Sequence, residues 1–170
     1  MKPTSLLLFF FAIAALLCVY PGRVRGFADG QTEITAAEQR IADGFKAKDI
    51  GQIMSCYVPD ESLILFDVIP PRQYVGAKAY RKDWEDLFAA FPGPAEAEIH
   101  DLSVKADHSL GYAHLVTRSV LTDKNGKKLE SMVRTTDVFQ KIGGKWLIVH
   151  EHNSVPVDLA SGKADLLSQP

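Results

Sequence analysis

Cysteine is scarce in this sequence of 170 residues, which contains two, Cys18 and Cys56. Only Cys56 follows the apolar run near the N-terminus, so removal of that run excludes an intramolecular disulfide. The remaining chain must be stable through its own hydrophobic core, for which about 140 residues suffice. The sequence also has no internal repeat and no low-complexity segment.

Positive charge is also in short supply, with 19 Lys and Arg against 21 Asp and Glu. Without the first 28 residues, Lys plus Arg falls to 16 while Asp plus Glu stays at 21, which gives a net charge of −5. Nucleic-acid-binding domains are typically basic, so this balance argues against a nucleic-acid partner.

The sequence has one long apolar run, Leu6–Tyr20, and this run is shorter than the ~20 residues that a membrane-spanning helix needs. Lys2 precedes it, and the small residues Gly26 and Ala28 follow it. The pattern predicts a signal peptide over residues 1–28, and hence a secreted or periplasmic protein with no other membrane segment. An uncleaved anchor is the alternative.

Hydrophobic periodicity predicts three helices and five strands. Thr35 and Glu38 have the spacing of a capping box in the first helix, and Asp49 can cap the second. The predicted helices cover 31–49, 50–57 and 77–91, and the predicted strands cover 62–68, 95–106, 110–122, 127–141 and 145–155. Helices followed by a strand meander predict an α+β domain over 29–158, with a curved antiparallel sheet wrapped around the N-terminal helices and a flexible tail over 159–170.

Two tight turns, Asn125-Gly126 and Gly143-Gly144, predict how the last three strands pair. Because side chains alternate between the faces of a sheet, two-residue loops at both turns sort the polar residues into two groups. One face then carries Thr117, Arg134, Thr136, Glu151 and Asn153, and the other carries His114, Asp137, His150 and His152. Both faces also carry large apolar residues, so one face takes the helices and the other is expected to form a homodimer.

Two segments, FDVIPPRQYVG and GKWLIVHEHNS, carry a resemblance to a known family. Over residues 33–157 the chain resembles the nuclear transport factor 2-like superfamily, in its SnoaL-like and ketosteroid-isomerase-like group and the SgcJ/EcaC-like bacterial subgroup. The resemblance implies a cone-shaped, cystatin-like α+β barrel with a pocket at its open end. In the hub domain of calmodulin-dependent kinases a similar last strand points an arginine into that pocket, which implies that Asn153 and its face line the pocket here.

Four residues are candidates for catalysis: Arg134 and Glu151 as an anion holder and an acid or base, His100 as a base near neutral pH, and Asp67 as a proton shuttle. The last role is implied by the aspartates of the isomerases. The alternatives are a structural ion pair, a rim histidine and a turn aspartate.

Six further residues are candidates for substrate binding. The aromatic residues can instead be plain core residues. The candidates are Tyr57, Tyr74, Trp84, Thr117, Thr136 and Asn153.

The row His114, Asp137 and His150 offers metal-ligand side chains on three neighbouring strands. Strands lie ~4.8 Å apart, so the three groups reach one ion only if they splay inward. We therefore expect no metal and no cofactor, and interpret the row as part of the dimer face.

The predicted function is cofactor-independent proton transfer, of the isomerase, dehydratase or cyclase type, on a small hydrophobic carbonyl compound. The alternative is a non-catalytic protein of the same fold that binds a small hydrophobic or acidic organic ligand or acts as a dimeric scaffold.

Overall fold

The computed structural model describes residues 25–168, so most of the predicted signal peptide lies outside the described residues. The first helix, α1, spans Arg25–Ala47 and begins several residues before the predicted start. Thr35 therefore lies inside the helix, and the predicted capping box is wrong. Glu38 instead points its carboxyl group inward and is 3% exposed.

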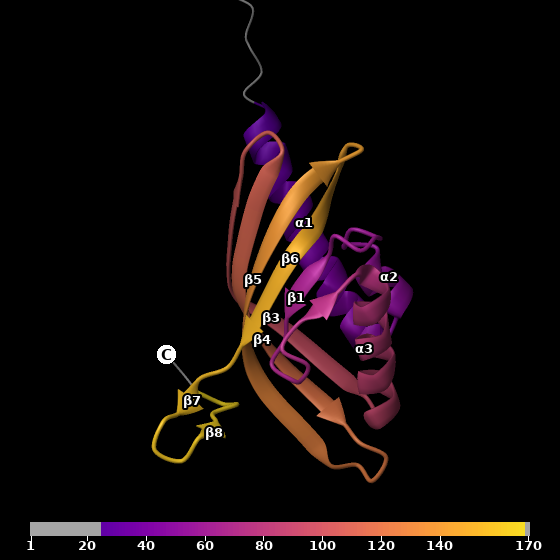
Figure 1. Cartoon of the computed structure of the whole chain (residues 1–170), viewed down its shortest axis with the longest axis vertical. Helices are drawn as coiled ribbons and strands as arrows, with labels where there is room; N and C mark the ends of the chain where they lie inside the picture. Colours follow the sequence, from indigo (N-terminus) through magenta and orange to yellow (C-terminus); the bar gives the residue numbers. More distant parts are fainter. Residues whose placement is uncertain (1–24, 169–170) are drawn as a thin grey trace, which may run out of the picture.

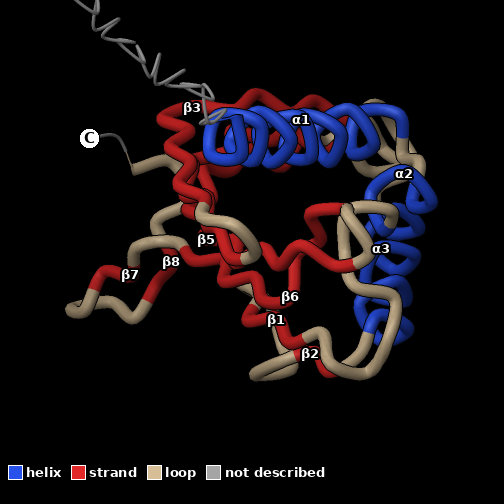
Figure 2. Tube along the Cα trace, turned by 90° about the horizontal axis from the view of Figure 1, so that it is seen from above, coloured by secondary structure: helices blue, strands red, loops and turns tan. Residues whose placement is uncertain are grey.

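The next two helices agree with the sequence pattern. Helix α2, Ile50–Met54, is capped by Asp49, whose Oδ1 accepts a hydrogen bond of 2.8 Å from the backbone nitrogen of Gln52. Helix α3, Ala77–Ala90, follows Gly76, which has the positive φ of 86° that glycine adopts readily. Both α1 and α3 lie on the same face of the curved sheet (Figures 1 and 2).

The sheet contains six strands in the order β2-β1-β6-β5-β4-β3. Their bounds are β1 Ile64–Phe66, β2 Tyr74–Val75, β3 Ala95–Ala106, β4 Leu110–Thr122, β5 Lys128–Ile142 and β6 Lys145–Ser154. All neighbours pair antiparallel except β1 and β6, which are parallel. The predicted α+β class with a curved, mainly antiparallel sheet is confirmed.

The turn between β4 and β5 is longer than predicted. Asp123 closes it with Oδ1, which accepts from the backbone nitrogens of Asn125 and Lys127 at 2.8 and 2.9 Å. Thr122 consequently pairs with Lys128, and the whole β4–β5 register differs by one residue from a two-residue loop.

The turn between β5 and β6 is the predicted one, since Ile142 pairs with Lys145. The register then shifts between Phe139, which faces Ile148, and Val138, which faces His150. This β-bulge leaves Val149 without a partner and reverses the alternation beyond it. Residues on both sides of the bulge, Ile148 and Glu151, therefore face the same side of the sheet, and both are buried.

The hydrophobic core lies between the helices and the sheet. Its largest fully buried side chains come from α1, α2, α3 and the strands next to them, and burial of each contributes about 1.5–3 kcal/mol. They include Ile34, Ile53, Leu63, Tyr80, Phe139 and Ile148.

The segment expected to be a flexible tail includes a small hairpin. Strand β7, Val157–Asp158, pairs with β8, Lys163–Ala164. After β8, the backbone oxygen of Leu166 accepts a hydrogen bond of 2.7 Å from the backbone nitrogen of Met132 on β5. The flexibility of this segment stays a prediction. Within residues 25–168, no helix has the length and apolar character required to span a membrane.

Candidate active site

A cavity of about 240 Å³ opens between α1, α3 and the inward face of the sheet. Its wall is mainly apolar, with four carboxyl groups and a few neutral polar groups set into it. The lining residues that matter for chemistry are Glu38, Tyr57, Asp67, Tyr80, Trp84, Thr117, Thr135, Asp137, Glu151 and Asn153. The structure thus brings together six of the predicted site residues: Tyr57, Asp67, Trp84, Thr117, Glu151 and Asn153.

Glu151, 4% exposed, is held by three hydrogen-bond donors at the inner end of the cavity. The Tyr80 hydroxyl donates to Oε1 at 2.8 Å, Asn153 Nδ2 donates to the same oxygen at 2.6 Å, and the Tyr57 hydroxyl donates to Oε2. Thr135 Oγ1 in turn donates to Asn153 Oδ1 at 2.6 Å and fixes the orientation of that amide. Three donors on two oxygens satisfy a carboxylate and orient it rigidly.

Two further carboxyl groups, those of Glu38 and Asp137, lie close enough to Glu151 for their charges to interact. Burial raises the pKa of Glu38 to about 8. Burial, with the charges of Glu151 and Glu38, raises the pKa of Asp137 well above its ordinary value. Glu38 therefore holds a proton near neutral pH, and the protonated form of Asp137 is favoured as well. Within the described part of the chain, Glu38 Oε1 and Asp137 Oδ1 are buried and have no hydrogen-bond partner.

Asp67 follows β1 and lines the same cavity. Its Oδ1 accepts from the backbone nitrogen of Val68 at 2.6 Å, as a turn aspartate would. Burial, together with the charge of Glu151, nevertheless raises its pKa to about 6. A carboxyl group with this pKa is largely ionised at pH 7 and can exchange a proton at little cost.

The other four predicted residues do not line the cavity. Arg134 and Thr136 were predicted to lie beside Glu151, but the longer β4–β5 turn and the bulge place both on the outer face, where they are exposed. Tyr74 donates from its hydroxyl to Asp83 Oδ1 at 2.7 Å instead of lining the cavity.

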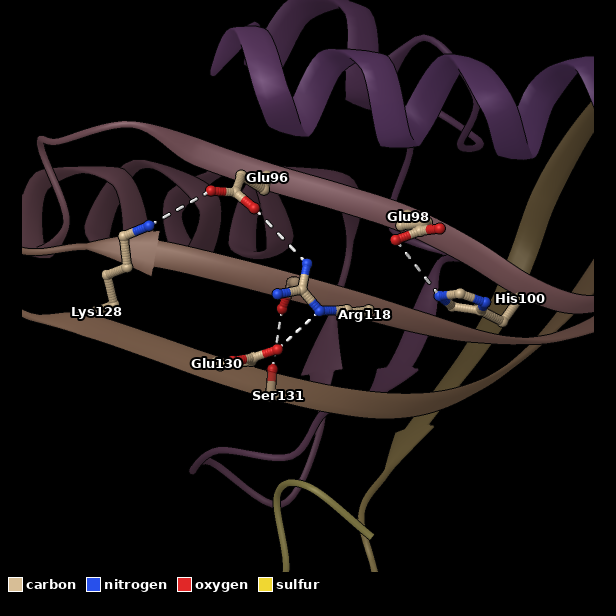
Figure 3. A network of polar contacts seen from close by, with 8 residues as sticks. Glu96, Glu98, His100, Arg118, Lys128, Glu130 and Ser131 are labelled. Carbon is tan, nitrogen blue, oxygen red and sulfur yellow. Dashed lines mark hydrogen bonds and ion pairs between the residues drawn. The ribbon is translucent and has the colours of Figure 1, made fainter. Parts of the chain in front are cut away.

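His100 also lies on the outer face, because Ile99 rather than His100 pairs with Thr117. Its Nε2 is 3.7 Å from Glu98 Oε2. Figure 3 shows this pair beside an ionic cluster in which Arg118 Nε is 2.7 Å from Glu130 Oε1 and Nη1 is 3.6 Å from Glu96 Oε2.

The predicted row of His114, Asp137 and His150 does not exist. Asp137 pairs with Glu151 and faces inward, whereas His114 pairs with the exposed Thr136 on the other side. His150 Nδ1 lies 2.8 Å from the backbone oxygen of Ile64. Among the residues that the structure describes, no group of three His, Cys, Asp or Glu side chains could hold a metal ion.

Four of the lining residues that matter for chemistry, Glu38, Tyr80, Thr135 and Asp137, were missed from the sequence. The sequence pattern indicates a capping role for Glu38 and the opposite face for Asp137, and it does not single out Tyr80 or Thr135. One signal was available: Glu38 follows Ile34 by four residues, so both lie on the same side of the helix that faces the core.

A helix-covered, curved antiparallel sheet with a cavity between the layers defines the nuclear transport factor 2-like class of folds. The chain belongs to the SnoaL-like family within it, because the model of the SnoaL-like domain matches residues 34–158. The predicted membership of the SgcJ/EcaC-like subgroup stays a prediction. No curated protein matches the chain.

Solved structures agree with this fold. An NTF2-like protein of unknown function from Pseudomonas putida KT2440 is 29% identical with a TM-score of 0.76, over 84% of this chain and 98% of that one. A nuclear transport factor 2-like superfamily protein from Salmonella enterica is 15% identical with a TM-score of 0.71, over 81% and 99%. A protein of Novosphingobium aromaticivorans, named provisionally as a scytalone dehydratase, is 11% identical with a TM-score of 0.68, over 76% and 86%.

Proposed function

We propose that the protein catalyses cofactor-independent proton transfer on a hydrophobic carbonyl compound, as an isomerase or dehydratase. The observation that carries this proposal is the contrast between carboxyl groups in one cavity. Burial raises the pKa of Glu38 to about 8 and that of Asp137 well above its ordinary value, whereas Asp67 has a pKa of about 6 and is mostly ionised at pH 7. Carboxyl groups whose environments separate their pKa values are suited to act as acid and base.

In the proposed reaction the carbonyl oxygen of the substrate lies at Glu38 Oε1 and Asp137 Oδ1, the buried carboxyl oxygens that have no hydrogen-bond partner among the described residues. Asp67 takes a proton from the carbon next to the carbonyl, and the electron pair of that C–H bond moves into an enol whose oxygen the carboxyl pair stabilises. Return of the proton from Asp67 to another carbon of the conjugated enol completes an isomerisation. In a dehydration, the C–O bond of a β-hydroxyl group breaks, and Asp67 gives its proton to the leaving hydroxyl, which departs as water. Glu151 is a poor base because three donors already occupy its oxygens.

Hydrogen isotope exchange tests the proposal without knowledge of the natural substrate. A panel of hydrophobic ketones is incubated with the protein in D₂O, and deuterium at the carbon next to the carbonyl is followed by NMR. We expect exchange to be fastest between pH about 6 and about 8, where Asp67 is ionised and Glu38 is protonated.

Asp67→Asn should lower this exchange by at least about 100-fold, the usual contribution of a general base. The matched control is Asp101→Asn, because Asp101 is exposed and lies outside the cavity. Ketones that bind to the cavity without any exchange would instead support the non-catalytic alternative and overturn the enzymatic proposal.

A further inference from the structure

The cavity is polar at one end and apolar at the other. At the inner end, Glu38, Asp137 and Glu151 are 3%, 1% and 4% exposed. Apolar lining residues from the loop after β1 and from the start of β5 are far more exposed: Ile69 is 44% exposed and Leu129 is 41% exposed. A molecule that fills the cavity must therefore combine one buried polar group with an apolar part that extends to the rim.

The cavity is also long. Asp137 and Leu129 both line it and lie at opposite ends of a row of inward side chains on β5, with Thr135, Val133 and Ser131 between them. At 3.3 Å per residue, this row covers roughly 25 Å of strand. A cavity of about 240 Å³ whose lining follows this row favours an extended molecule that runs along β5.

The charges of the wall restrict the polar group of the ligand. Four lining residues are acidic, and none of the described residues that line the cavity is Lys, Arg or His. An anionic group would be repelled and would find no cation to pair with. A cationic group at the inner end would face Glu38, which keeps its proton up to pH about 8, and Glu151, whose oxygens already accept from three donors. Trp84 lines the cavity, and its buried Nε1 has no hydrogen-bond partner within residues 25–168, so it can donate a hydrogen bond to a ligand oxygen.

We propose that the ligand is an extended, uncharged amphiphile. Its carbonyl or hydroxyl head lies against Glu38 and Asp137, and its unbranched hydrocarbon chain follows β5 toward the rim at Ile69 and Leu129. This inference rests on the proposed function and gives it a substrate class. It also excludes the acidic organic ligand that the sequence left as an alternative.

Calorimetric titration with the 2-alkanones from six to ten carbons at pH 7 tests this ligand class. Each added methylene should tighten binding by about fourfold, the value expected for full burial of a CH₂ group. Val133 lies four residues from Asp137, about 13 Å along β5, which is within reach of the ten-carbon ketone but not of the six-carbon one. Val133→Ser should therefore weaken binding of the longest ketone by at least threefold and leave the shortest unchanged. The matched control is Leu110→Ser, because Leu110 is 58% exposed and lies outside the cavity.

Alkanoates and alkylamines of the same lengths test the charge of the head, and both should bind more weakly than the ketones. A carboxylate or an amine that binds more tightly than its matched ketone would overturn the proposal, and so would an affinity that does not depend on chain length. Binding is read here without turnover, so absence of isotope exchange together with the expected length series would overturn only the proposed function.

Discussion

Both faces of β5 and β6 carry ionisable residues, but those residues differ in type and in burial. Inward, Asp137 and Glu151 are almost fully buried, without a basic residue among the described lining of their cavity. Outward, Arg134 on β5 and His152 on the neighbouring strand β6 are exposed. The comparison shows that chemistry here depends on burial, since the more conspicuous histidine and arginine are exposed to water, whereas burial raises the pKa values of Asp137 and of its neighbour Glu38.

The largest loss of stability is expected from removal of the Glu151 carboxylate. In Glu151→Ala, two tyrosine hydroxyls and the Asn153 amide lose their acceptor, so the free energy of unfolding should fall by about 3 kcal/mol. Urea unfolding followed by circular dichroism measures the loss. His152→Ala changes the next residue, which faces the opposite side, and should cost less than about 0.5 kcal/mol. Equal losses in the two variants would contradict the difference between the faces.

The raised pKa values of the inner carboxyl groups should make the stability of the protein depend on pH. The folded-state pKa of Glu38 is about 8 against an ordinary value of 4.5, so the folded protein binds more protons than the unfolded chain between these values. The contribution of Glu38 to the free energy of unfolding is therefore fully present below pH about 4.5. It declines as the pH rises toward about 8, by up to about 1.4 kcal/mol per pH unit. Asp137, shifted in the same direction, adds to the decline.

Urea unfolding between pH 5 and 8 measures this slope, and Glu38→Gln should reduce it because an amide does not titrate in this range. A wild-type stability that rises across the same interval would show that the inner carboxyl groups are ionised in the folded protein.

A smaller effect is expected from removal of one donor to Glu151. Tyr80→Phe deletes the hydroxyl that donates at 2.8 Å and leaves the other two donors in place, so it should cost about 1 kcal/mol. Thermal unfolding provides the measurement, with Tyr112→Phe as the control because Tyr112 is 45% exposed. A loss in Tyr112→Phe as large as in Tyr80→Phe would count against the inner network.

The smallest loss of stability is expected when the ionic cluster of the outer face is disrupted. Arg118→Ala removes the ion pairs with Glu96 and Glu130, which are exposed to solvent and screened by salt (Figure 3). We expect the melting temperature to fall by no more than about 2 °C, and by less at 1 M NaCl. A drop comparable to that of Glu151→Ala would mean that the outer face contributes as much stability as the inner one.

Most of the fold could be predicted from the sequence because helical periodicity, strand alternation and the Asn-Gly and Gly-Gly turns are local signals. The site could be predicted only in part, because it depends on register. Asp123 extends one turn by hydrogen bonding to the backbone, and the bulge at Val149 has no sequence signature, yet together they exchange the places of Arg134 and Asp137. The predicted homodimer and export stay predictions, which light scattering and cell fractionation can test.

The protonation state of Asp137 at pH 7 tests the account most directly. In protein labelled with ¹³C at the side-chain carboxyl groups, Asp137→Asn and Glu38→Gln assign the two resonances, and an NMR titration follows them. We predict that the Asp137 carboxyl is still protonated at pH 7, and that Glu38 titrates near pH 8. Titration of both groups near pH 4, the ordinary value for exposed carboxyl groups, would contradict the account.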